Sequence, residues 1–416
     1  RSSAMAEAVV QLDEAIALLA QVDDGTEKKR MEMEAQAMRG LTLAATRGYS
    51  APGVREAYER ALDLSQELGD DALHLRALLG LYGYSMATGE PALAHFVGNQ
   101  LLALAEERKD DDDLQLANYL ITGGNLSDRG KLAPAADFYE RAIAKLDDAS
   151  PDQALWLRAQ DPGVVASSML ARNRFILGQA DSARRALDDA QRRAKAVNHA
   201  FSEGFARSVA ASVLSSMRDW EAAESAAAAA LEVAERHGFP SWQAQAGIFL
   251  GLASIKLGRT SEGIARIERA KDIGEKIWKG GPALFYRVAL GEAALALGHL
   301  DEAISMAKEG LAHIDSRGGG AHEAELHRLF GTALRQKGDT TAAIESFERA
   351  IAVAQGQSAL AWELRATIEL AELRCRSGDI DGAQTLLAPV YDRLTEGRDT
   401  ADARRAAEIL ESIPAA

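Results

Sequence analysis

The 416-residue chain has little of what cross-links a fold, breaks helices or anchors a protein in a membrane. Its one cysteine, Cys375, cannot form a disulfide within the chain, which is typical of a reducing compartment, and we expect a cytoplasmic protein. Nine prolines and 6% aromatic residues leave few helix breakers and few β-favouring residues. No run of about 18 apolar residues occurs, so neither a transmembrane helix nor a membrane partner is expected.

Positive charge is also scarce, because the chain has 47 basic residues and 62 acidic ones, which gives a net charge of −15. A chain of this charge lacks the basic face that coats phosphates, and nucleic acid is not an expected partner. The many Ala, Leu, Glu and Arg residues lose little side-chain freedom in a helix. Composition therefore predicts an all-α protein.

Short turns recur along the chain at nearly constant spacing. Gly258, Gly298, Gly338 and Gly378 lie 40 residues apart, and each is followed by residues that can begin a helix. The same rhythm extends backwards through an Arg-Asp turn and four further glycines, at Arg218, Gly178, Gly130, Gly89 and Gly48. Nine turns at this spacing indicate a repeat architecture.

Each turn separates two amphipathic stretches, so each repeat is expected to be a helical hairpin. Small residues stand where the two helices would touch, as at Gly331, Ala343 and Ala350, with the large Phe347 between them. This spacing resembles the tetratricopeptide pattern. It predicts an all-α, tetratricopeptide-like α-solenoid of about nine helical hairpins with a roughly 40-residue period.

The chain is expected to be one superhelix, 1–416, without a linker between domains. We assign 1–22 to a leading helix, 23–147 to N-terminal repeats, 148–163 to an irregular loop, 164–395 to regular 40-residue repeats and 396–416 to a C-terminal capping helix. The loop carries about eight extra residues, including Trp156. It is either a plain surface excursion or a flap near the binding groove that orders when a ligand binds. The opening Arg1-Ser2-Ser3 is interpreted as a cloning remnant or a cut between domains.

Motifs that carry catalysis are missing. The sequence has no phosphate-binding P-loop and no nucleophile elbow. His322 and His327 are five residues apart, whereas two zinc ligands on one helix face are four apart. Cys375 has no neighbouring histidine. We therefore expect no catalytic residue, no cofactor, no metal and no enzymatic activity of this chain.

Several segments resemble the C-terminal tetratricopeptide region of bacterial signalling proteins, in which a class III adenylate/guanylate cyclase domain and a STAND-type ATPase module precede the repeats. The matching segments are Glu325–Leu329, Glu363–Ala366, Val390-Tyr391 and Thr395–Gly397, with Gln160–Val164, Gly238–Trp242 and Gly48–Pro52 upstream. The chain departs from the family at Arg374-Cys375, where a Leu-Trp pair is usual, and at Arg398, which replaces an aromatic residue. The family's nucleotide-binding and cyclase residues have no counterpart here.

The resemblance implies a non-catalytic interaction and regulatory domain, the sensory C-terminal part of a bacterial cyclase/ATPase signalling protein. Its partner is then a protein or peptide, or the preceding ATPase and cyclase domains of the parent. Two alternatives stay open. One is a free-standing peptide-binding adaptor, and the other is the repeat domain of a maltose-regulator-type transcription activator.

The expected binding surface is the concave wall made by the first helix of each repeat. Concave positions fall three residues before, and one and four residues after, the small residue of that helix. They are Ser168, Arg172, Phe175, Ser208, Ser212, Ile248, Leu252, Ile255, Glu292, Arg328 and Arg335, together with Ser215, Val288, Leu295 and Thr332. An apolar middle with arginines at one end suits a peptide with an acidic end. Alternatively, Arg328 and Arg335 pair with acidic neighbours such as Glu292 and Glu325.

Overall fold

A computed structural model describes residues 2–88, 90–147, 160–278, 284–315 and 319–412. Within these ranges the chain is helical and no strand occurs. The helices are α1(Ser2–Leu19), α2(Thr26–Arg47), α3(Val54–Leu68), α4(Asp71–Thr88), α5(Pro91–Glu107), α6(Asp112–Asp128), α7(Leu132–Asp147), α8(Pro162–Ile176), α9(Ala180–Val197), α10(Ala200–Ser216), α11(Trp220–His237), α12(Pro240–Lys256), α13(Thr260–Ile277), α14(Leu284–Ala296), α15(Leu300–Asp315), α16(Glu323–Gln336), α17(Thr340–Gly356), α18(Leu360–Ser377), α19(Ile380–Asp392) and α20(Ala401–Ser412).

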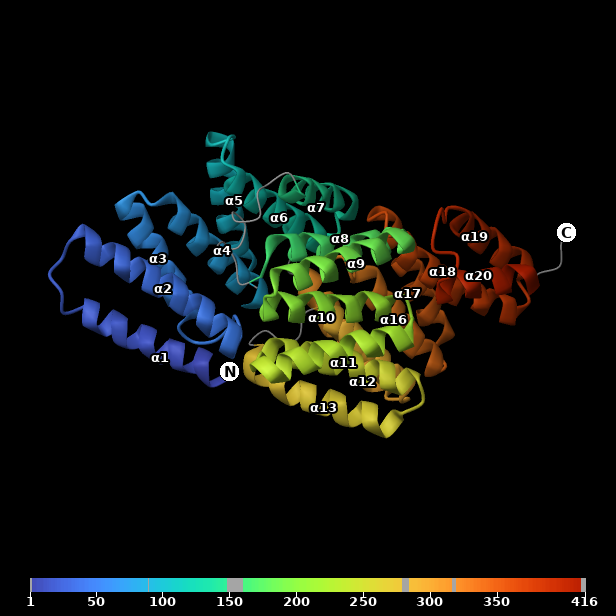
Figure 1. The fold of residues 1–416 in the computed structure, drawn as a ribbon. Helices are drawn as coiled ribbons and strands as arrows, with labels where there is room; N and C mark the ends of the chain where they lie inside the picture. The colour runs from blue at the N-terminus through green and yellow to red at the C-terminus, as the bar shows by residue number, and fades with distance from the viewer. Residues whose placement is uncertain (1, 89, 148–159, 279–283, 316–318, 413–416) are drawn as a thin grey trace.

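The helices pair into the nine hairpins expected from the turns, from α2/α3 to α18/α19, with α1 before them and α20 after them. The tetratricopeptide-like α-solenoid is thus confirmed. Figure 1 shows α8–α17 packed together in the middle of the molecule, with α1–α3 extending at one end and α19–α20 at the other. None of the helices in the described part of the chain is both long and apolar enough to cross a bilayer.

Local sequence explains why the hairpins form. Gly258, Gly338 and Gly378 all have φ between +85° and +91°, a left-handed conformation that glycine adopts without strain and that ends the first helix. At the corresponding turn, Arg218 adopts φ +58° although it is not glycine. Asp219, Asp339 and Asp379 then cap the second helices, because their side chains accept hydrogen bonds from free backbone N–H groups.

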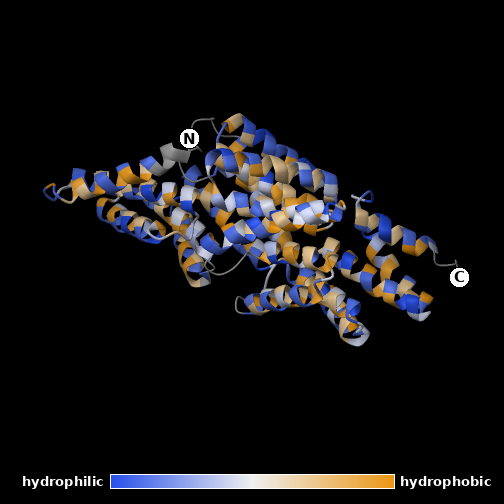
Figure 2. Cartoon of the chain, turned by 90° about the horizontal axis from the view of Figure 1, so that it is seen from below, coloured by the Kyte–Doolittle hydropathy of each residue, from blue (hydrophilic) through white to orange (hydrophobic). Residues whose placement is uncertain are grey.

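Small residues bring the paired helices into backbone contact. A Cβ added at Gly251 would lie 2.7 Å from the carbonyl oxygen of Gly263, and one added at Gly263 would lie 2.6 Å from that of Gly251. A Cβ at Gly331 would lie 2.7 Å from the ring of Phe347, which fills the groove as the pattern predicts. Apolar and polar residues alternate around each helix in Figure 2, since one side packs on neighbours and the other meets water.

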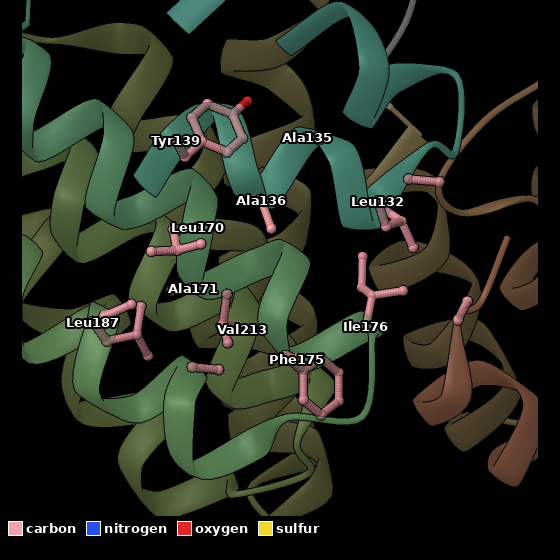
Figure 3. Packing of buried hydrophobic residues seen from close by; sticks show 14 of the residues in the cluster. Leu132, Ala135, Ala136, Tyr139, Leu170, Ala171, Phe175, Ile176, Leu187 and Val213 are labelled. Atoms are coloured by element: carbon pink, nitrogen blue, oxygen red, sulfur yellow. The ribbon is translucent and has the colours of Figure 1, made fainter. Parts of the chain in front are cut away.

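The buried apolar core runs through the hairpins from one to the next. Its largest cluster includes residues of α6, α7, α8, α9 and α10, and Figure 3 labels ten of its members. Tyr139 and Leu132 are 1% exposed, and Ile176 likewise. Most of the irregular loop predicted at 148–163, including Trp156, lies outside the described residues, and its role in binding stays a prediction.

Candidate ligand-binding inner face

The first helices of the six C-terminal hairpins form a closed ring. Each of α8, α10, α12, α14, α16 and α18 contacts the next, and α18 contacts α8. At this last contact, the ring of Trp362 on α18 meets Phe175 on α8 edge-on, with centroids 5.4 Å apart. The predicted concave wall is therefore the inner face of a ring.

The C-terminal segment fastens the ring at what we call the closing seam, where 394–402 meets the turns of α8–α11. The Glu396 carboxylate accepts hydrogen bonds from the Ser182 backbone N–H (3.1 Å) and hydroxyl (3.2 Å), at the start of α9. The Gly397 N–H donates to Asp181 (3.1 Å), and Arg184 pairs with Asp399 (3.2 Å). Asp402 pairs with Arg218 across the seam (3.3 Å).

Most of the predicted binding residues are enclosed by the ring. Arg172, Glu292, Val288 and Arg335 are half-buried. The others are at most 9% exposed: Ser168, Phe175, Ser208, Ser212, Ser215, Ile248, Leu252, Ile255, Leu295, Arg328 and Thr332. The predicted positions thus lie on the first helices of the ring and are mostly buried, and their use in binding stays a prediction.

Arg328 and Arg335 pair with carboxylates, which is the alternative that the sequence left open. Arg328 is 1% exposed and donates to Glu325 (2.9 Å) and to Glu292 on α14. Arg335 pairs with Glu369 on α18 (2.7 Å). The charges that looked available for a ligand are thus engaged within the protein.

These pairs belong to a larger set that we call the closing charge network: Arg218, Lys256, Glu292, Glu325, Arg328, Arg365 and Asp402. Arg365 on α18 donates to Glu325 (2.9 Å), to Asp402 (2.8 Å) and to the carbonyl oxygen of Ser216 in α10. Burial raises the pKa of the Glu292 carboxyl, but the charges of Arg328 and Lys256 outweigh it and hold this pKa well below its usual range. The Glu292 carboxylate is therefore ionised near neutral pH.

Sequence reasoning missed four members of this network. Arg365 and Asp402 lie on α18 and α20, beyond the last first helix considered, Arg218 lies in a turn, and Lys256 is the last residue of α12. The spacing of Glu325 and Arg328, three residues apart on one helix, was the available signal for their pairing.

Arg172 differs from the arginines of the network. Its guanidinium donates to the Ser127 hydroxyl (3.2 Å), and within the described residues no carboxylate lies at ion-pair distance from it. Its Nε has no hydrogen-bond partner there, and neither have the hydroxyls of Ser168, Ser208 and Tyr286. Those three side chains are 0–2% exposed.

Aromatic rings enclose this region. The rings of Phe285 on α14, His322 at the start of α16 and Trp362 on α18 follow one another with centroids 6.1 and 6.4 Å apart. Burial lowers the pKa of His322 to about 3, and the nearby positive charge of Arg172 adds to this effect. His322 is therefore neutral at pH 7. Among the described residues, His, Cys, Asp and Glu side chains do not form any group of three that could hold a metal ion.

A surface pocket of about 420 Å³ opens in the outer layer between α11 and α13. It lies beside the alanine-rich α11, where Ala227 stands in place of a large residue. Four of its five charged lining residues pair with one another, Glu224 with Arg259 and Glu262 with Arg266, and the fifth is Glu221. The pocket therefore offers no uncompensated positive charge to a ligand.

No family model matches the sequence, and no curated protein matches it either. Among solved structures, the chain is similar to a Rap protein complexed with Competence and Sporulation Factor, with a TM-score of 0.58 and 15% identity over 91% of this chain and 99% of that one. Aspartyl phosphate phosphatase F from Bacillus subtilis gives 0.46 and 16% over 92% and 96%. A signal-transduction ATPase with numerous domains and a tetratricopeptide-repeat sensor, from Pyrococcus horikoshii, gives 0.40 and 14% over 97% and 65%. The likeness to the Rap structure, at 15% identity, supports the α-solenoid fold alone.

Proposed function

We propose that the chain is a regulatory repeat module that binds a segment of a protein partner on the inner face of its ring of first helices. The observation that carries this proposal is the register of that face. Residues at equivalent positions of α8, α10, α12 and α16, which the helical register assigns to one side of each helix, are buried or half-buried, with an apolar centre at Ile248, Leu252 and Ile255. A continuous surface of this kind can follow an extended or helical segment over several repeats.

Binding would act through the shape of the ring. A segment that contacts several first helices favours the ring curvature to which it binds more tightly, and the closing seam is where two arrangements could differ. The module then works as a ligand-biased brake or clamp and carries out no catalytic step itself. The turn between α2 and α3 contacts the ring directly, because the Ser50 hydroxyl donates a hydrogen bond to the carbonyl oxygen of Ile277 at the end of α13. A change in ring shape could reach the N-terminal repeats through this contact.

Two settings fit this proposal. The resemblance of the C-terminal segments favours a sensory region behind cyclase and ATPase domains. The free-standing adaptor is favoured by a different observation, since this chain spans 99% of the Rap chain. That Rap protein was crystallised with Competence and Sporulation Factor, which supports the idea that a chain of this length and fold can bind a ligand by itself.

Hydrogen exchange tests the location of binding. A partner found by chemical cross-linking should slow exchange in α8, α10, α12, α14 and α16 more than in the outer helices α11, α13 and α15. Protection confined to α1–α5 or to the outer helices would contradict the proposal. In a parent that carries cyclase or ATPase domains, deletion of 1–416 should abolish the response of nucleotide turnover to the partner, and unchanged turnover would exclude the sensory setting.

A further inference from the structure

Among the described residues of the ring, Arg172 is a positively charged side chain without a carboxylate partner. A guanidinium is always charged at physiological pH, and a charge removed from water needs a counter-charge or a full set of hydrogen bonds. Arg328 and Arg365 have both. Half-buried Arg172 has one bond, to Ser127, and no carboxylate partner among the described residues.

Hydroxyls on α8 and on the helix packed against it also lack partners. Ser168 is one helical turn before Arg172 on α8, and Ser208 occupies the position equivalent to Ser168 on α10. Tyr286 reaches this interior from α14, where Arg172 acts electrostatically on its phenol. Buried hydroxyls normally find a partner, so a group of them around an unpaired cation indicates a missing acceptor.

We propose that Arg172, with the hydroxyls of Ser168, Ser208 and Tyr286, binds a carboxylate of the partner segment. This inference rests on the proposed function and deepens it by naming the chemistry at one end of the ligand. A carboxylate matches the site because its two oxygens accept several hydrogen bonds and its charge neutralises the guanidinium in a bidentate pair. The sequence pattern had placed the acidic end of the ligand at Arg328 and Arg335. The structure assigns it instead to Arg172.

The neutral state of His322 fits this assignment. A second cation beside Arg172 would compete for the same carboxylate, whereas a neutral imidazole among Phe285 and Trp362 adds apolar surface. In the bound partner segment, the residue next to the carboxylate should therefore be apolar. The part of that segment that lies along α12 should also be apolar.

The test uses two matched peptide pools as probes. Both contain N-acetylated pentapeptides of Leu, Ile, Val and Ala; one pool ends in a free carboxylate and the other in an amide. Succinate serves as a small carboxylate, and an amidated pool with one internal Asp tests a side-chain carboxylate. Binding is read from Tm and from tryptophan fluorescence, because Trp278 stacks on Tyr286 at 5.3 Å and Trp362 lies beside His322.

We expect the carboxylate-ended pool, or the Asp pool, to bind the unmodified protein at least tenfold more tightly than the plain amide pool. Arg172→Gln should remove this preference. Arg174→Gln, which removes the same charge from the same helix at a residue paired with Glu140, should keep it. Should Arg172→Gln fail to fold by circular dichroism, Arg172→Lys retains the charge and should keep the preference at lower affinity.

Four results would overturn the carboxylate site. They are equal binding of the acid and amide pools, absence of binding by every pool, an acid preference that survives in Arg172→Gln, and a crystal structure in which Arg172 pairs with a carboxylate of the chain itself. Equal binding of both pools, with protection of the first helices, would leave the proposed function standing. Absence of binding by every pool would overturn the carboxylate site, and the proposed function would also fail if the cross-linked partner leaves α8–α16 unprotected.

Discussion

Arg328 and Arg172 both belong to first helices of one ring, yet they differ in their partners. Arg328 is paired with carboxylates and Arg172 is not. Arg328 is held by Glu325, Glu292 and Glu369 from three helices. Arg172 bonds to the Ser127 hydroxyl and has no carboxylate at ion-pair distance within the described residues. A buried charge that holds the fold together is thus matched by carboxylates of the chain itself, whereas a charge that serves a ligand is left without one.

Removal of Arg328 should have the largest effect. Arg328→Met removes one of the two cations that pair with Glu325 and one of the two that pair with Glu292, while Arg365 and Lys256 remain. We expect the free energy of unfolding in urea to fall by about 3–5 kcal/mol, because breaking a buried ion pair leaves charge poorly compensated. Arg236→Met removes an exposed arginine paired with Glu232 and should cost less than about 1 kcal/mol. A loss below about 1 kcal/mol for Arg328→Met would show that the network does not hold the ring.

Acid should destabilise the ring through the histidine beside Arg172. Burial lowers the pKa of His322 to about 3, whereas an unfolded histidine has a pKa of 6.5. Below pH 6.5 the unfolded chain therefore binds a proton at His322 that the folded chain does not bind. Stability is therefore complete above about pH 6.5 and falls as the pH drops towards 3, by about 1–2 kcal/mol between pH 6.5 and 5.

The variant His322→Gln should remove that part of the loss, measured by urea unfolding at both pH values. His327, whose pKa burial lowers to about 4, adds a second loss in the same direction that the variant retains. A pH dependence identical in the variant and the unmodified protein would contradict the assignment to His322.

Opening the closing seam should have a smaller effect on stability and a larger one on shape. Gly397 has φ +70°, and a Cβ there would lie 2.6 Å from the Cβ of Ala180. Gly397→Ala should therefore cost about 1–2 kcal/mol and increase the radius of gyration in X-ray scattering at unchanged helix content.

Gly258→Ala is the matched control for the seam, since Gly258 has φ +85° and open space around its Cβ position. It should carry a similar backbone cost without any change in scattering. Equal radii for both variants would show that the seam does not depend on Gly397.

The smallest change is expected at Arg172 itself. Arg172→Met removes a charge that lacks a counter-charge, so stability of the unliganded protein should stay the same or rise by up to about 1 kcal/mol. Arg174→Met, which removes a paired arginine, provides the comparison in the same urea experiment. A loss of more than about 2 kcal/mol would mean that Arg172 supports the fold, and its contrast with Arg328 would disappear.

The sequence was sufficient for the hairpins but not for the ring. Turn glycines, capping aspartates and small residues act within one repeat, so their spacing predicts the hairpins, and helical register predicts that Ile248 and Leu252 share a side. Closure depends instead on small packing angles between neighbouring hairpins that add up over six repeats. A local sequence pattern does not determine the total of these angles. For the same reason, the sequence did not reveal that Arg365 would pair with Asp402 or that Arg172 would have no carboxylate partner.

The seam also changes how this protein can reach its native state. A linear solenoid folds by adding each hairpin to its neighbour, so its contacts are short-range and the process can start anywhere. The bond between Ser182 and Glu396 joins residues 214 positions apart, so it forms only after most of the repeats are in place. During synthesis, the side of α8 and α9 that later contacts the C-terminal segment therefore stays exposed to solvent until residue 396 has left the ribosome. That interval is when a chaperone or a ligand would have its easiest access to the interior.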